Sequence, residues 1–202
     1  MSKELLVILV QNPVWGEVKP KIAKTMGNDK ALFIYNSLIK HTFEITHALK
    51  CDKSVYYSQF IQIDDIWNGA FYRKALQKGK EWNEVMDNIM KDFEAGHYEK
   101  LVITCCDFMT LASAHIEEAF DKLTDFDAVL GPTQRGGYYL MGIRKRHPNL
   151  FVGKKPNDEN LLLDTVLELQ KNNCKVAFLD PLRAIRTDED YHAFKGYFSK
   201  SH

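Results

Sequence analysis

A glycine-punctuated stretch joins two expected strands and reads Gly131-Pro132-Thr133-Gln134-Arg135-Gly136-Gly137-Tyr138-Tyr139-Leu140-Met141-Gly142. The apolar run 128–130 predicts a strand that ends where this stretch begins, and a second strand is expected over 138–143. Paired glycines let a backbone turn sharply, or approach a ligand where a Cβ would collide. This stretch therefore predicts a turn with exposed backbone between two buried strands.

Strand and helix patterns alternate on both sides of this turn. Continuous or alternating apolar runs predict strands over Leu5–Val10, Lys53–Phe60, Leu101–Thr104, Ala128–Leu130, Tyr138–Ile143 and Lys175–Leu179. Helical periodicity predicts helices over Ala31–Leu49, Glu81–Glu94, Ser113–Leu123, Asn160–Gln170 and Asp188–Phe198. Helices between strands imply crossover connections. We therefore expect an α/β fold, with a Rossmann-like, mostly parallel sheet sandwiched by helices.

The bulk composition excludes several classes of protein. A chain of 202 residues with 45% hydrophobic residues is long enough for one domain, which we place over residues 1–202. The 27 basic and 27 acidic residues cancel, which argues against nucleic acid or an anionic membrane as the partner. The apolar run 5–10 is too short to span a membrane, and we expect a cytoplasmic protein. The four cysteines show no metal-ligand spacing and are expected to be buried thiols.

Three loops follow expected strands, where open α/β sheets bind their ligands. The first is Gln11-Asn12-Pro13-Val14-Trp15-Gly16-Glu17-Val18-Lys19-Pro20-Lys21-Ile22. The second is Cys105-Cys106-Asp107-Phe108-Met109-Thr110-Leu111, and the third is the glycine stretch quoted above. By position they are expected to meet at one cleft.

These three motifs, in this order, resemble a bacterial family of glycosyltransferase-like proteins, the radical-SAM/selenodomain-associated transferases. The family has the nucleotide-diphospho-sugar transferase fold, also called glycosyltransferase-A. Its motifs look like K-x-P-x-x-G-x-V-K-T-R-L, G-x-D-x-P-x-L and G-P-x-x-D-G-G-Y-Y-L-x-G. The resemblance runs from Leu5 to about Tyr191, and the third motif is the most specific.

The resemblance implies a nucleotide-binding site built from these loops. Phosphate-binding roles would fall to Pro13, Gly16, Lys19 and Lys21 of the first loop and to Gly136 and Gly137 of the third. Asp107 would be the catalytic acid and metal carboxylate. A hard cation such as Mg²⁺ or Mn²⁺ would bridge the diphosphate and offset the charge of the leaving group.

The sequence departs from the family pattern in this same site. Arg135 stands where the third motif has an acid, and Arg186 stands in a C-terminal run that is usually acidic. Pro20 also removes a backbone N–H that could bind phosphate. We therefore expect a divalent ion to bind weakly or not at all, with Arg135 and Arg186 contacting phosphate in its place, and Arg135 counted with Asp107 among the catalytic residues.

The function that follows is a transferase-like protein that binds a nucleotide or nucleotide sugar and passes a glycosyl group to an unidentified acceptor. One alternative is a catalytically inactive relative that acts as a binding or assembly module. A further alternative is a nucleotidyltransferase that makes an activated cofactor precursor. The sequence leaves the donor, the acceptor and the oligomeric state open.

Overall fold

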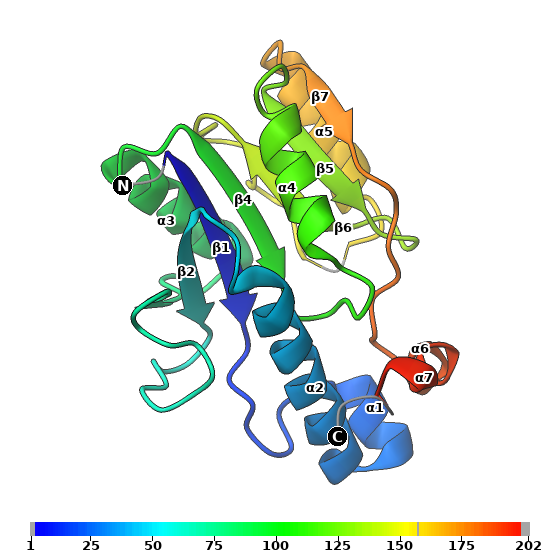
Figure 1. The fold of residues 1–202 in the computed structure, drawn as a ribbon. Helices are drawn as coiled ribbons and strands as arrows, with labels where there is room; N and C mark the ends of the chain where they lie inside the picture. Colours follow the sequence, from blue (N-terminus) through cyan, green and yellow to red (C-terminus); the bar gives the residue numbers. More distant parts are fainter. Residues whose placement is uncertain (1–2, 157, 199–202) are drawn as a thin grey trace.

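A seven-stranded sheet forms the centre of the computed structural model, which describes residues 3–156 and 158–198 (Figure 1). The strands lie in the order β3-β2-β1-β4-β6-β5-β7. Their bounds are β1 (Glu4–Val10), β2 (Asp52–Tyr57), β3 (Arg73–Leu76), β4 (Lys100–Cys105), β5 (Ala128–Pro132), β6 (Tyr138–Ile143) and β7 (Val176–Phe178).

Most neighbouring strands are parallel. β1 pairs in parallel with β2 and β4, β2 with β3, and β5 with β7, whereas β6 runs antiparallel to both β4 and β5. The glycine stretch is the reason for the reversal, because a short turn between β5 and β6 can only produce an antiparallel pair. The expected mostly parallel α/β sheet is confirmed.

Helices cover both faces of the sheet. The helices are α1 (Pro20–Met26), α2 (Asn28–Thr46), α3 (Trp82–Ala95), α4 (Ser113–Lys122), α5 (Leu161–Lys171), α6 (Asp188–Ala193) and α7 (Lys195–Phe198). In β1, Leu6 and Ile8 pack into the core beneath α2 and α4, while Leu5 and Val7 pack into the core beneath α3 and α5. This period-two alternation is what a strand buried on both sides requires.

A third apolar cluster lies beyond the carboxyl ends of the parallel strands. Ile22 of α1 and Ile34 of α2 pack there with Ile185, Tyr191 and Phe198 from the C-terminal segment. Figure 1 shows α1, α6 and α7 gathered on the side to which the arrowheads of β1, β2 and β4 point. The segment from Ile185 to Phe198 therefore returns to the edge of the sheet where ligands of this fold class bind.

Several element boundaries differ from the sequence prediction. The expected strand Lys53–Phe60 ends at Tyr57, and the expected helix Ala31–Leu49 runs over Asn28–Thr46. The single C-terminal helix expected over Asp188–Phe198 is interrupted at Phe194 and forms two short helices. The first two differences fall at element ends, which the periodicity of side chains defines least well, whereas the break at Phe194 lies inside the expected helix.

Two elements were missed. The pattern around Pro20 predicts a loop, but the structure has helix α1 there, because proline is well placed in the first turn of a helix. β3 was missed because its four residues are half-exposed or exposed and carry no buried apolar run. No helix among the described residues is long and apolar enough to cross a membrane.

Candidate functional site

The topology brings the three motif loops to one edge of the sheet. The first loop follows the carboxyl end of β1, and Asp107 follows that of β4. β6 is antiparallel to β4 with Leu140 opposite Thr104, so the turn that precedes β6 lies at the same edge. The C-terminal segment reaches this edge as well, since the Ile185 amide donates to the Asp107 carbonyl oxygen at 2.8 Å.

A cleft of about 270 Å³ opens at this edge, and we call it the Asp107 cleft. Most of its lining is apolar or aromatic, and its polar residues are few. The residues that matter to its chemistry are Trp82, Cys105, Asp107, Tyr138, Tyr139 and Arg186. An apolar cleft with one acid and one guanidinium suits a ligand that combines a flat, apolar part with a charged group.

Asp107 and Lys19 form a close ion pair inside this site. The Lys19 ammonium lies 2.6 Å from Asp107 Oδ1 and also donates to the Ile185 carbonyl oxygen at 2.8 Å. The exposed fraction is 7% for the Lys19 side chain and 29% for that of Asp107. The ammonium lies 5.5 Å from the centre of the Tyr35 ring, within cation–π range. The pair thus joins the first loop, the second loop and the C-terminal segment.

The rest of the first loop is fixed by polar contacts. Asn12 is fully buried, and its side chain donates to the Phe60 carbonyl oxygen at 2.9 Å while accepting from the amide of Gln59 at 2.9 Å. Gly16 is exposed with φ of +81°, a backbone conformation that glycine adopts without strain. Lys21 is also exposed, in the first turn of α1.

Pro13 lies away from the Asp107 cleft. It lines a separate cavity of about 380 Å³ together with Trp67 and Tyr57. Asp65, on the wall of that cavity, pairs with Lys74 at 2.7 Å and accepts the backbone amide of Trp67. Asp65 therefore serves local structure through contacts that need no ligand.

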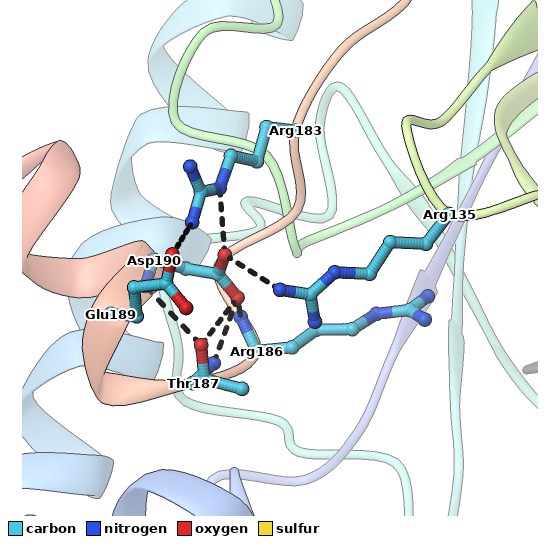
Figure 2. A network of polar contacts seen from close by, with 6 residues as sticks. All are labelled: Arg135, Arg183, Arg186, Thr187, Glu189 and Asp190. Atoms are coloured by element: carbon cyan, nitrogen blue, oxygen red, sulfur yellow. Dashed lines mark hydrogen bonds and ion pairs between the residues drawn. The ribbon is translucent and has the colours of Figure 1, made fainter.

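Arg135 reaches the C-terminal helix. One of its terminal nitrogens lies 3.4 Å from Asp190 Oδ1, and the Arg135 side chain remains 49% exposed. Arg183 Nε donates to the same oxygen at 2.7 Å. Figure 2 shows the two guanidinium groups approaching the Asp190 carboxylate from different sides. Asp190 itself is buried, with a side-chain exposure of 1%.

The second oxygen of Asp190 holds the backbone before α6. Asp190 Oδ2 accepts from the amides of Arg186 and Thr187 at 3.0 and 2.9 Å, and from the Thr187 hydroxyl at 3.0 Å. Burial alone would raise the pKa of Asp190, but the hydrogen bonds from Arg183 and from these donors lower it below its ordinary value. Asp190 is therefore a buried carboxylate that stays charged.

Arg186 is the arginine that lies in the cleft. It lines the Asp107 cleft and also a cavity of about 10 Å³ next to it, which Arg135 and Arg183 line too. In Figure 2 only the backbone amide of Arg186 is joined to Asp190, and its side chain runs alone beside that of Arg135. Among the described residues, no hydrogen bond or ion pair involves the Arg186 guanidinium, which leaves it available to an anion.

The two glycines of the third loop differ in their surroundings. A Cβ on Gly136 would lie 1.9 Å from the carbonyl oxygen of Glu159, and φ there is +83°. The Gly136 carbonyl oxygen accepts the amide of Leu162 at 2.9 Å. Contacts with Glu159, just before α5, and with Leu162 in its first turn thus account for this glycine without a ligand. Gly137 is less crowded, with Thr133 Oγ1 3.5 Å from an added Cβ.

The thiols do not supply a nucleophile to the cleft. Burial raises the pKa of Cys105 well above its ordinary value, and the neighbouring Asp107 carboxylate raises it further. Burial likewise raises the pKa of Cys106 to about 12. Both groups are therefore neutral thiols near pH 7, and all four cysteines are free.

The residues around Asp107 do not fit a divalent cation. Among the residues that the structure describes, no group of three or more His, Cys, Asp or Glu side chains could hold a metal ion. A positive charge already contacts Asp107, and near a protein surface a unit charge and a divalent ion about 4 Å apart repel by about 8 kcal/mol. Mg²⁺ or Mn²⁺ would also need several oxygen ligands, and Asp107 is the one carboxylate among the described residues that line the cleft.

Sequence reasoning missed three residues of this site. Asp190 and Arg183 were not singled out, although Thr187-Asp188-Glu189-Asp190 has the form of a capping box, which the structure contains. Trp82 lies within the helix expected over Glu81–Glu94 and was not singled out. Nothing in its local pattern indicates that the N-terminus of α3 borders the cleft.

Solved structures share the fold of this protein. A provisionally named nucleotide-diphospho-sugar transferase from Desulfovibrio desulfuricans G20 matches with a TM-score of 0.89 and 24% identity, over 100% of this chain and 90% of that one. A 4-diphosphocytidyl-2C-methyl-D-erythritol synthase from Anaerococcus prevotii DSM 20548 matches with a TM-score of 0.62 and 11% identity, over 98% and 99% of the two chains. A CMP:2-keto-3-deoxy-manno-octonic acid synthetase complexed with CTP matches with a TM-score of 0.55 and 9% identity, over both full chains. The protein thus has the α/β fold shared by nucleotide-diphospho-sugar transferases and cytidylyltransferases.

The sequence itself places the protein more narrowly. Residues 42–155 match the model of a family described as "Uncharacterized protein conserved in bacteria (DUF2064)", and the chain belongs to this family. No curated protein matches the sequence significantly.

Proposed function

We propose that the protein binds a nucleotide or nucleotide sugar in the Asp107 cleft and acts as a glycosyltransferase-like protein. The observation that carries the proposal is the Arg186 guanidinium, which lines a mostly apolar cleft beside Asp107. A guanidinium can bind a phosphate group through two parallel N–H···O bonds. Trp82 and Tyr138 on the same cleft offer aromatic surface to a base or sugar.

The charge of the site supports an anionic ligand. Around the small cavity, Arg135, Arg183 and Arg186 contribute three positive charges, and Asp190 and Glu189 contribute two negative ones. The local balance is therefore one positive charge. Lys21 and Gly16 belong to the same edge of the sheet and would complete the phosphate contacts, and Gly137 would contribute backbone.

The names of the structural neighbours suggest the class of reaction. One neighbour is named a nucleotide-diphospho-sugar transferase, another, from Leptospira borgpetersenii, is named a cytidylyltransferase, and a third is a synthetase in complex with CTP. Glycosyl transfer from a nucleotide sugar is the reaction we propose, in line with the resemblance to the radical-SAM/selenodomain-associated transferases. Nucleotidyl transfer from a triphosphate is the alternative that the cytidylyltransferase neighbours favour.

Binding without catalysis is a second candidate function, favoured by the ion pair between Lys19 and Asp107. Because its carboxylate is already paired with Lys19 at 2.6 Å, Asp107 is less available to a metal ion or a substrate. A nucleotide-binding module would keep the cleft and lack turnover. Incubating the protein with nucleotide sugars and triphosphates, followed by analysis of the products, separates this candidate from the two transferases.

Calorimetric titration with nucleoside diphosphates, triphosphates and nucleotide sugars tests the binding proposal. We expect at least one of these ligands to bind, and Arg186→Ala to weaken it about 10- to 100-fold, because a hydrogen bond to a charged group contributes about 1.5–3 kcal/mol. Arg144→Ala is the matched control, since Arg144 is exposed at the far end of β6, at the opposite edge of the sheet. If no nucleotide binds, or if both variants bind alike, the proposal is wrong.

A further inference from the structure

The Lys19 ammonium has the surroundings of a bound cation. It contacts one carboxylate oxygen and one carbonyl oxygen, at 2.6 and 2.8 Å, and lies over the face of the Tyr35 ring. The Lys19 side chain is almost entirely buried. A buried ammonium needs such partners, because its desolvation is otherwise very unfavourable.

The backbone of Lys19 has an unusual conformation at the start of α1. Lys19 has φ of +49°, in the left-handed region that side-chain-bearing residues seldom adopt, and it directly precedes α1. Its carbonyl oxygen accepts the amide of Ala23, which fixes the first turn of the helix. A strained residue persists only where its surroundings determine it strongly. The contacts of the ammonium and the start of α1 together provide that determination.

We infer that Lys19 is the resident cation of the Asp107 cleft and takes the place that a divalent metal ion would occupy at Asp107. The ammonium neutralises Asp107 and ties together the first loop, the second loop and the C-terminal segment. Asp107 and Arg186 line the cleft, and Lys19 contacts Asp107 from outside this lining, so the three side chains together carry one net positive charge without any metal ion. Lys19 is a positioning residue in this account, since its ammonium contacts the protein and not the ligand.

The inference concerns the cleft of the proposed function, but its test uses Mn²⁺ alone. Free hexaaqua Mn²⁺ gives a sharp electron paramagnetic resonance signal that is lost on binding, so the dissociation constant is measured directly. Failure of every nucleotide to bind would disprove the proposed function and leave this measurement unaffected.

Four folded proteins are compared: the wild type, Asp107→Asn, Lys19→Glu and the double variant. We expect the wild type and Asp107→Asn to bind Mn²⁺ equally weakly. Lys19→Glu adds a carboxylate next to Asp107 and should tighten Mn²⁺ binding at least about tenfold, because it removes one repelling charge and adds an attracting one. Adding Asp107→Asn should abolish the gain. Lys24→Glu is the control, with the same change of charge at an exposed position of α1, and should resemble the wild type.

Two results would overturn the inference. One is a wild-type protein whose Mn²⁺ binding falls at least about tenfold in Asp107→Asn, since that would place the metal at Asp107 beside an intact Lys19. The other is a folded Lys19→Glu variant that binds no more Mn²⁺ than Lys24→Glu. Circular dichroism establishes folding, and if Lys19→Glu does not fold, the comparison of the wild type with Asp107→Asn decides alone.

Discussion

Replacing Asp190 by asparagine should destabilise the protein, because it removes the buried carboxylate that accepts several hydrogen bonds. Asp190 Oδ1 accepts from Arg183 and Arg135, while Oδ2 accepts from the amides of Arg186 and Thr187 and from the Thr187 hydroxyl. An asparagine has one oxygen and one NH₂ group. Whichever way it is oriented, its NH₂ group faces donors and leaves them without an acceptor.

The expected loss is about 3 kcal/mol of unfolding free energy. Breaking a buried ion pair by removing one partner typically has an effect of about 3–5 kcal/mol. The lower end applies here, because Arg183 is partly exposed and water can solvate its guanidinium once the carboxylate charge is gone. Arg135 is about half exposed and adds little. For a protein of this size, about 3 kcal/mol corresponds to a fall in Tm of about 6–12 °C.

Urea unfolding and calorimetry of the wild type, Asp190→Asn and Glu189→Gln test this expectation. Glu189 is the matched control, because it contacts the same Arg183 at 3.4 Å but is 79% exposed, and its replacement should change stability by less than about 0.5 kcal/mol. A loss in Asp190→Asn no larger than that in Glu189→Gln would refute the reasoning.

The difference in unfolding free energy between the wild type and Asp190→Asn should also depend on pH. The folded-state pKa of Asp190 is lowered, so its stabilisation is fully present above the unfolded-state pKa of about 3.9 and is lost as pH falls through the folded-state value. The two stability curves should therefore stay apart above about pH 4 and converge below it. Curves that remain parallel into the acid range would show that the charge of Asp190 is not the cause.

Two further substitutions test the framework of the site. Gly136→Ala should destabilise the protein by about 2 kcal/mol more than Gly153→Ala in urea unfolding. Both glycines have positive φ, but of the two only Gly136 has a neighbour, the carbonyl of Glu159, with which a Cβ would collide. Equal losses of stability would show that the backbone around Glu159 moves aside at little cost. Asn12→Ala should destabilise the protein by about 2 kcal/mol, because it empties a buried site and leaves part-buried backbone groups of Gln59 and Phe60 without partners. It should also speed amide hydrogen exchange in the first loop, and unchanged exchange would contradict the role given to Asn12.

Much of the fold could be read from residue patterns. The continuous apolar run of β1 and the alternation of helices with strands indicated a mostly parallel sheet, because buried parallel strands must be apolar on both faces. The glycine stretch at Gly136 and Gly137 marked the turn before the antiparallel β6. Patterns of this kind carry local information, so β3, which has no buried run, was missed.

The site was predictable by residue type and only partly by arrangement. The resemblance singled out Lys19, Asp107, Arg135 and Arg186, and the structure connects the first two directly and the last two through Asp190 and a shared cavity. The sequence could not indicate that Lys19 pairs with Asp107. That contact joins residues 88 positions apart and depends on how α1 packs beyond the sheet.

The sequence by itself determined the class of fold, because periodic burial and the alternation of strands with helices are local patterns. The tertiary structure alone decided which charges neutralise one another. Such pairing depends on distances of a few ångströms between segments far apart in the chain, and Coulomb energies at those distances change with burial. Lys19 and Arg186 are both cations in the sequence; packing holds the first against Asp107 and leaves the second facing the cleft.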